Sequence, residues 1–246
     1  MTTLWIDFET FNRVDIGVGA HIYAQTAEVL LCSYAVDGGP VKLWDAAQGE
    51  DLPHDLRERL NDDETLLVAH NAGFDRLIVT HALGLETRLE RWRCTMALAY
   101  SHAFPGSLDA VCKALGLPAD KAKSDDGKKL IQRFCKPAAK NHKADRYDHT
   151  THPAEWERFR LYAIQDVAAM REVARRLPRW NWKPRDIDLW HRDQRINDRG
   201  IAIDRELCEA GARAAVTEKE NLAAEFIELT GGVVDAPTKR EKFRVY

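Results

Sequence analysis

The chain has 246 residues, of which 45% are hydrophobic and 30% charged, and its formal net charge is −3 at pH 7. This composition is typical of a globular protein with a sizeable core, and no apolar run approaches the roughly 18 residues of a membrane span. Five scattered cysteines without a Cys-x-x-Cys pair argue against a disulfide or zinc framework and predict reduced thiols. The N-terminal residues lack the features of a signal peptide, so we expect a cytoplasmic protein without a membrane partner.

Charge is distributed unevenly along the chain. Residues 1–90 contain 16 acidic residues against 6 Lys/Arg, whereas residues 121–146 contain 9 Lys/Arg against 3 acidic residues. Acidic residues can gather metal ions, and a basic stretch can contact phosphates. The asymmetry therefore favours a metal-dependent enzyme acting on a polyanion, with a solvated basic loop as the alternative.

The first half of the chain alternates between strand and helix patterns. The branched and aromatic residues of 4–9 predict a buried strand, and a turn at 37–40 joins two further strands into a hairpin. The predicted elements are strands at 28–36, 41–44, 65–69 and 89–94, and helices at 52–60 and 73–83, with a polar connection at 11–25. This order predicts an α/β fold in which helices flank a mixed sheet.

The second half of the chain is predicted to be mainly helical. Ser107 and Gly116 are suited to cap one helix, and Pro153 and Pro178 flank the longest one. The predicted helices cover residues 107–115, 125–134, 153–177, 186–197 and 205–229. A junction at 179–184 divides the chain into a main domain, 1–178, and a helical extension, 179–246.

Two carboxylates, Asp7 and Glu9, lie at the end of the first predicted strand. Because side chains alternate along a strand, Asp7 and Glu9 point to the same side, with Cα atoms roughly 7 Å apart. A hard divalent cation such as Mg²⁺ or Mn²⁺ would offset the cost of burying both charges. The signal is weak alone, since Asp62 and Glu64 share this spacing in a stretch that reads as a solvated turn.

Two further segments place an aspartate on a predicted helix, Asp75 near a helix start and Asp166 within the long helix. Asn71 is placed to cap a helix that follows a buried strand, and Asp75 lies one turn further on. Asp75 either interacts favourably with the helix dipole or projects toward a ligand at the carboxyl end of the sheet. Tyr162 and Asp166 share a face of the long helix, where a buried carboxylate needs a partner, a hydrogen bond or a cation.

Together these segments resemble the DEDD superfamily of 3′→5′ exonucleases, also called DnaQ-like or RNase H-like. The motifs are Asp7-Phe8-Glu9-Thr10, His70-Asn71-x-x-x-Asp75 and Tyr162-x-x-x-Asp166. Tyr162 indicates the tyrosine subclass, because Leu161 stands where the histidine subclass has its histidine. The resemblance covers residues 1–178 and implies an RNase H-like fold.

The resemblance also implies a site and a mechanism. Two divalent ions, Mg²⁺ or Mn²⁺, would be held by four carboxylates, and the terminal phosphodiester would be hydrolysed by a two-metal mechanism. The implied catalytic and metal-binding residues are Asp7, Glu9, Asp75 and Asp166, with Tyr162 orienting the attacking water. Asn71 is expected to contact the strand backbone and Phe11 to stack on the terminal base.

A narrower resemblance concerns phage-type family A DNA polymerases. It is carried by the segments Cys94-Thr-Met-Ala-Leu-Ala99, Pro105-Gly-Ser-Leu-Asp109, Gly127-x-x-Leu-Ile131 and Trp156-x-x-Phe-x-x-Tyr162. Residues 196–232 are similar to the connection that leads to a polymerase thumb, whereas palm and fingers motifs are absent. This implies the proofreading portion of a polymerase, acting on a single-stranded or frayed DNA 3′ end alongside a polymerase domain or other replication proteins. The alternatives are an RNA-trimming 3′→5′ exonuclease and a catalytically silent DNA-binding domain.

Overall fold

The computed structural model describes residues 2–117, 125–139, 144–236 and 238–245. The chain divides into two compact units, Met1–Asp198 and Arg199–Tyr246. All residues of the predicted site belong to the first unit. Four lysines of the predicted basic stretch lie outside the described residues: Lys121, Lys123, Lys140 and Lys143.

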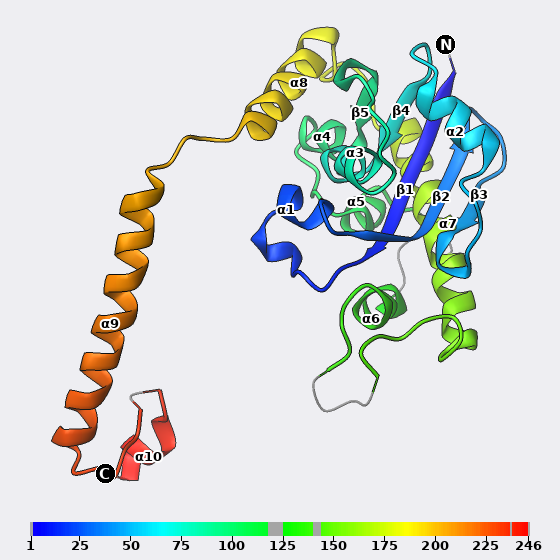
Figure 1. The fold of residues 1–246 in the computed structure, drawn as a ribbon. Coiled ribbons are helices and arrows are strands. Elements are labelled where there is room, and N and C mark those ends of the chain that lie inside the picture. The colour runs from blue at the N-terminus through cyan, green and yellow to red at the C-terminus, as the bar shows by residue number, and fades with distance from the viewer. Residues whose placement is uncertain (1, 118–124, 140–143, 237, 246) are drawn as a thin grey trace. The chain divides into compact units, whose positions relative to one another are not determined.

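A five-stranded mixed sheet forms the centre of the first unit (Figure 1). Its strands are β1 (Thr3–Phe11), β2 (Glu28–Val36), β3 (Lys42–Asp45), β4 (Leu66–Ala69) and β5 (Trp92–Cys94), in the order β3-β2-β1-β4-β5. The first three strands are antiparallel, whereas β4 and β5 run parallel to β1. The predicted α/β fold with a mixed sheet is confirmed.

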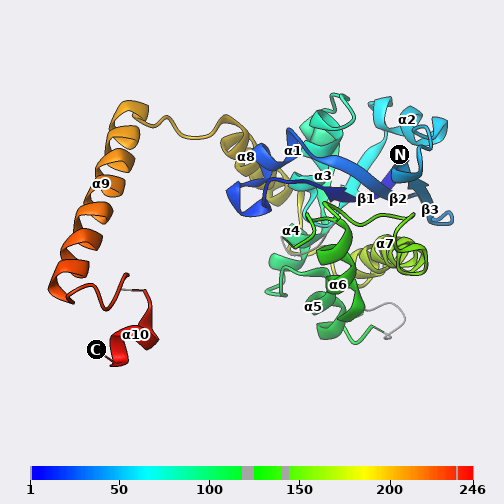
Figure 2. The same ribbon diagram turned by 60° about the horizontal axis from the view of Figure 1, so that its bottom comes forward.

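Helices cover both faces of the sheet (Figure 2). Leu4, Ile6 and Phe8 of β1 are buried in one core cluster with residues of α2 (His54–Asn61) and α3 (Ala72–His81). The intervening residues of β1 point to the other face, where α7 (Pro153–Arg176) crosses β1, β2 and β3. The alternation that buries the even-numbered residues thus directs Asp7 and Glu9 toward α7.

Two further helices accompany α7 on this face. They are α5 (Leu108–Ala114), which is capped by Ser107 as predicted, and α6 (Asp125–Phe134). Phe134 of α6 packs against Trp156 and Phe159 of α7, with ring centroids 4.9 and 5.3 Å apart. These aromatic contacts hold α6 against α7.

Several short elements were not predicted. The connection at 11–25 contains α1 (Ala20–Ala24), and α4 (Thr95–Tyr100) follows β5 directly. Short 3₁₀ turns cover Ile16–Val18, Ala46–Gln48 and Leu89–Arg91, the last in place of the first half of the strand expected at 89–94. These elements are short, and α1 has no side-chain cap, so periodicity and capping give little signal for them.

The predicted helical C-terminal extension is confirmed. It begins with α8 (Pro184–Arg199), most of which belongs to the first unit. His191 of α8 is buried and hydrogen-bonds to the carbonyl oxygen of Trp92 at 3.0 Å. The second unit contains α9 (Arg205–Leu229) and α10 (Arg240–Val245). Within the described ranges, every helix is too short or too polar to cross a membrane.

Candidate active site

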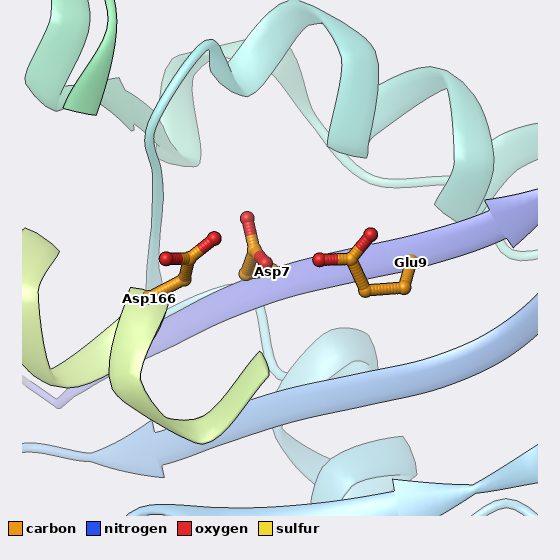
Figure 3. Close-up of side chains that lie close together, drawn as sticks. All are labelled: Asp7, Glu9 and Asp166. Carbon is orange, nitrogen blue, oxygen red and sulfur yellow. The ribbon is translucent and has the colours of Figure 1, made fainter. Parts of the chain in front are cut away.

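Three carboxylates from distant parts of the chain converge beside the sheet. Asp7 and Glu9 come from β1, and Asp166 comes from α7, which lies over that strand (Figure 3). One carboxylate oxygen of each residue lies within 4.8 Å of the other two. Glu9 and Asp166 are only 8% and 5% exposed, so their charges are largely removed from water. The structure therefore brings together three of the four predicted acids around one point.

The fourth acid, Asp75, lies in the first turn of α3 and contacts β1 next to Asp7. Its Oδ1 accepts a hydrogen bond from the backbone N–H of Phe8 at 3.2 Å, and the side chain is 2% exposed. The parallel pairing of β1 with β4 ends at Trp5, so a side chain rather than a strand receives this N–H. Burial, together with the charge of Asp7, raises the pKa of Asp75 well above its usual range.

Tyr162 lies one helical turn before Asp166 and is buried between two neighbours. Its ring stacks on Phe159 of the same helix, with centroids 6.3 Å apart. Gly127 of α6 contacts the ring so closely that a Cβ at this position would lie 2.3 Å from Cε2 of Tyr162. Glycine is therefore required for α6 to approach Tyr162. In the sequence, Gly127 stands out only as part of the Gly127-x-x-Leu-Ile131 segment.

Asn71 occupies the N-cap position of α3, as predicted, but its side chain makes no capping hydrogen bond. Its φ of 70° lies in the left-handed region, which asparagine tolerates better than most residues. The preceding His70 hydrogen-bonds to Thr95 Oγ1 at 2.9 Å and to the carbonyl oxygen of Gly106 at 2.7 Å. The turn is thus fixed by His70, and Asn71 is exposed to solvent.

Phe11 is buried, and the guanidinium group of Arg146 stacks over its ring. The guanidinium carbon of Arg146 lies 4.1 Å from the ring centroid, and Arg146 makes two hydrogen bonds to Glu28 at 2.6 and 3.1 Å. Phe11 itself is 5% exposed. A nucleobase could stack on this ring only after Arg146 moved, so the expected role of Phe11 requires a rearrangement.

A cavity of about 240 Å³ lies beside Glu9. Its walls are largely apolar and include Phe74 of α3 and Ile131 of α6. Cys135, which follows α6, also lines the cavity, and its Sγ donates to Oε2 of Glu9 at 3.8 Å. Sequence reasoning missed this thiol, because nothing in local periodicity links it to a residue on β1.

The donor set fits a hard divalent cation. Carboxylate oxygens are the ligands that Mg²⁺ and Mn²⁺ prefer, and three of them are available from Asp7, Glu9 and Asp166. Crowding three carboxylates within 4.8 Å, two of them buried, is unfavourable without a positive charge between them. The cluster can therefore hold a metal ion that polarises a phosphate or a water molecule.

Comparison with known sequences yields one informative relative. No model of a known protein family matches the chain. The chain is 39% identical over 237 residues to a DNA polymerase of Bacillus phage SP02. The match covers 94% of this chain but 36% of that polymerase, so the chain spans about a third of the length of its relative.

Comparison with solved structures finds more distant similarities. Brucella melitensis NrnC bound to pGG is 15% identical, with a TM-score of 0.49 over 78% of this chain and 79% of that one. Brucella melitensis NrnC with bound Mg²⁺ is 14% identical, with a TM-score of 0.47 over 78% and 81%. The family B DNA polymerase of Pyrobaculum calidifontis is 14% identical, with a TM-score of 0.44 over 70% and 24%.

Proposed function

We propose that this chain is a metal-dependent 3′→5′ exonuclease that hydrolyses the terminal phosphodiester of single-stranded or frayed DNA. The convergence of Asp7, Glu9 and Asp166 within 4.8 Å carries the proposal. The order and spacing of the three motifs in the sequence support it independently. A buried carboxylate cluster suits phosphodiester hydrolysis because cations held there can neutralise the charge of the phosphate.

The four acids would form two sets of metal ligands that share Asp7. Asp7, Glu9 and Asp166 would hold one divalent ion, and Asp7 together with Asp75 would hold a second. When bound, the two ions would act as Lewis acids that stabilise both the attacking and the leaving oxygen. The hydrogen bond from the Phe8 N–H fixes the carboxylate of Asp75 against β1 and so orients it.

Tyr162 is assigned the task of orienting the attacking water. Phenols titrate near pH 10, so at neutral pH a tyrosine hydroxyl acts as a hydrogen-bond donor or acceptor rather than as a base. The contacts of the ring with Phe159 and Gly127 restrict where the hydroxyl can lie. Asn71, which is exposed at the start of α3, would contact the strand backbone. Phe11 would stack on the terminal base once Arg146 is displaced.

The substrate class and the biological role rest on the sequence relative. A polymerase with which the chain shares 39% identity handles DNA, which favours DNA over RNA. We infer that the exonuclease removes mismatched nucleotides during polymerisation and cooperates with a polymerase domain. A mismatched 3′ end frays easily, and a single-stranded end can enter a buried site without first being melted.

The decisive experiment measures which end is digested and what is released. With Mg²⁺, single-stranded DNA labelled at its 3′ terminus should release a labelled mononucleotide immediately, whereas 5′-labelled DNA should give a descending ladder. EDTA should stop the reaction, and a phosphorothioate at the last linkage should delay it. Release from the 5′ end, or internal cuts in a circular single strand, would contradict the proposal.

A matched RNA strand completes this experiment. Faster digestion of RNA than of DNA would assign the site to RNA trimming, with the same four acids. Binding without hydrolysis of either strand, in Mg²⁺ and in Mn²⁺, would indicate a catalytically silent DNA-binding domain.

A further inference from the structure

A groove of about 680 Å³ runs along α6, and we call it the α6 groove. The polar side chains that line it are Lys128, Lys129, Gln132 and Arg133 of α6, together with Tyr147 and His152. Among the described residues, no carboxylate lines this groove. The inner side of α6 is apolar, with Leu130 and Phe134 buried, so packing against α7 leaves the basic side outward.

The groove combines positive charge with an aromatic surface. Lys128 and Lys129 are exposed at neighbouring positions. The Arg133 guanidinium pairs with Glu155 and lies 6.0 Å from the centroid of the Tyr147 ring. Glu155 offsets the charge of Arg133, and the exposed Lys128 and Lys129 place two further cationic side chains on the groove wall. Cationic groups beside aromatic rings are the features with which proteins bind single-stranded nucleic acid.

The groove adjoins the cavity beside Glu9. Pro137 lines both the α6 groove and the cavity beside Glu9. Ile131 and Cys135, one helical turn apart, line the cavity, whereas Gln132 and Arg133 line the groove. One helix and the residue Pro137 therefore separate the basic groove from the carboxylate cluster.

We infer that the α6 groove binds the phosphates of the DNA strand on the 5′ side of the terminal nucleotide. The strand would pass over Pro137, so that its 3′ end reaches the cavity beside Glu9. This inference rests on the proposed exonuclease function, because it is the adjacent carboxylate cluster that makes a nucleic-acid strand the expected polyanion. Lys128 and Lys129 would each contact a phosphate, and Tyr147 would offer a stacking surface to a base.

The double variant Lys128→Gln/Lys129→Gln tests this inference in the full chain. Its matched control is Lys113→Gln/Lys183→Gln, which removes two exposed lysines that line neither the groove nor the cavity. Hydrolysis is measured on a dinucleotide, too short to reach the groove from the site, and on a strand of about twelve nucleotides. Binding of the longer strand is measured by fluorescence anisotropy in EDTA over a range of salt concentrations. Melting temperatures establish that both variants fold.

In the groove variant, the ratio of kcat/KM for the long strand to that for the dinucleotide should fall about fivefold. The slope of log Kd against log salt should become smaller by about 1.4, since each phosphate contact with a single strand contributes about 0.7. The control variant should change neither quantity. An unchanged ratio and slope in the groove variant would overturn the inference while leaving the exonuclease proposal intact. If the wild-type chain cleaved neither substrate, the exonuclease proposal would fail, and the anisotropy measurement would still decide whether the groove binds DNA.

Discussion

The carboxylates of Asp7, Glu9 and Asp166 repel one another unless a cation or a proton lies between them, because their oxygens are within 4.8 Å. Asp7→Asn removes one charge at nearly constant shape. We therefore expect the metal-free variant to be as stable as the wild type or up to about 1 kcal/mol more stable. Its hydrolysis should fall by at least about a thousandfold, because a cation in this cluster loses a charged ligand.

Melting curves in EDTA and in Mn²⁺ distinguish the two effects of Asp7→Asn. The wild type should gain stability when Mn²⁺ is added, and the variant should gain much less. If Mn²⁺ raised the melting temperature of both proteins equally, Asp7 would not be a metal ligand.

The substitution Tyr162→Phe removes the hydroxyl and keeps the ring, so it distinguishes the role of the hydroxyl from that of ring packing. The ring contacts with Phe159 and Gly127 are retained, so stability should change by less than about 1 kcal/mol. Turnover should fall by about ten- to a hundredfold if the hydroxyl orients the attacking water. Urea unfolding measures the stability, and single-turnover rates measure the hydrolysis step. Unchanged turnover would assign Tyr162 to packing alone.

Helix α6 contacts Tyr162 of the candidate site through Gly127 and also lines the α6 groove. Gly127→Ala would place a methyl group 2.3 Å from Tyr162 Cε2, so either the ring or the helix must move. We expect a loss of about 1–3 kcal/mol in stability and a fall in turnover at saturating substrate. The control Gly211→Ala, in α9 with nothing within 4 Å of the added group, should leave turnover unchanged and stabilise its helix. Equal effects of the two substitutions would show that α6 does not restrain Tyr162.

The turn that leads into α7 depends on Asp148. Its Oδ1 accepts the N–H groups of Thr150 and Thr151 at 3.0 and 2.9 Å. Burial raises the pKa of Asp148, but hydrogen bonds from these two threonines outweigh it and lower the pKa to about 2. Because the folded-state pKa lies below the unfolded value, the carboxylate stabilises the fold above about pH 4, and this contribution is lost as the pH falls through about 2.

Asp148→Ala should therefore lower the free energy of unfolding by about 1 kcal/mol at neutral pH, a value reduced by solvent screening. Near pH 2 the difference from the wild type should shrink to a small fraction of this. Urea unfolding at both pH values measures it, and a pH-independent difference would show that the turn acts through packing alone.

At the scale of the whole molecule, strong local signals predicted most of the fold. The helix at 205–229 and the capped helix after Ser107 were found within a residue or two, because caps and apolar periodicity act locally. The helix at 20–24 was missed because it has only five residues and because its N-cap residue is Gly19. Glycine has no side chain with which to cap a helix, so the sequence carries no sign that a helix starts there. Local patterns are informative only where an element is long enough to show a period.

The candidate site was predicted to a different extent from the fold. Strand alternation predicted that Asp7 and Glu9 share one side of the strand, and the motif resemblance predicted that Asp166 joins them. In the structure the three carboxylates do lie together. The contact of Cys135 with Glu9 and that of Gly127 with Tyr162 could not be predicted. Both depend on how α6 packs on α7, and such packing follows from side-chain shapes rather than from sequence spacing.

Where the domain that carries the candidate site ends can be tested by truncation. All candidate site residues precede residue 178, but the compact first unit continues to Asp198 and includes most of α8. His191 of α8 is 4% exposed and hydrogen-bonds to the carbonyl oxygen of Trp92, and the neighbouring Trp190 packs against the core cluster that contains Trp92. Removing α8 would expose this apolar surface and leave the Trp92 carbonyl without that hydrogen bond.

We therefore expect residues 1–198 to melt within about 2 °C of the full chain and to retain hydrolysis of a dinucleotide. Residues 1–178 should melt at least about 5 °C lower, because a loss of 1 kcal/mol shifts the melting temperature of a domain of this size by about 2–4 °C. Calorimetry of the three proteins in EDTA makes the comparison without any contribution from bound metal. Equal melting temperatures for the two truncated proteins would place the end of the folded domain at residue 178, and α8 would then belong functionally to the helical extension.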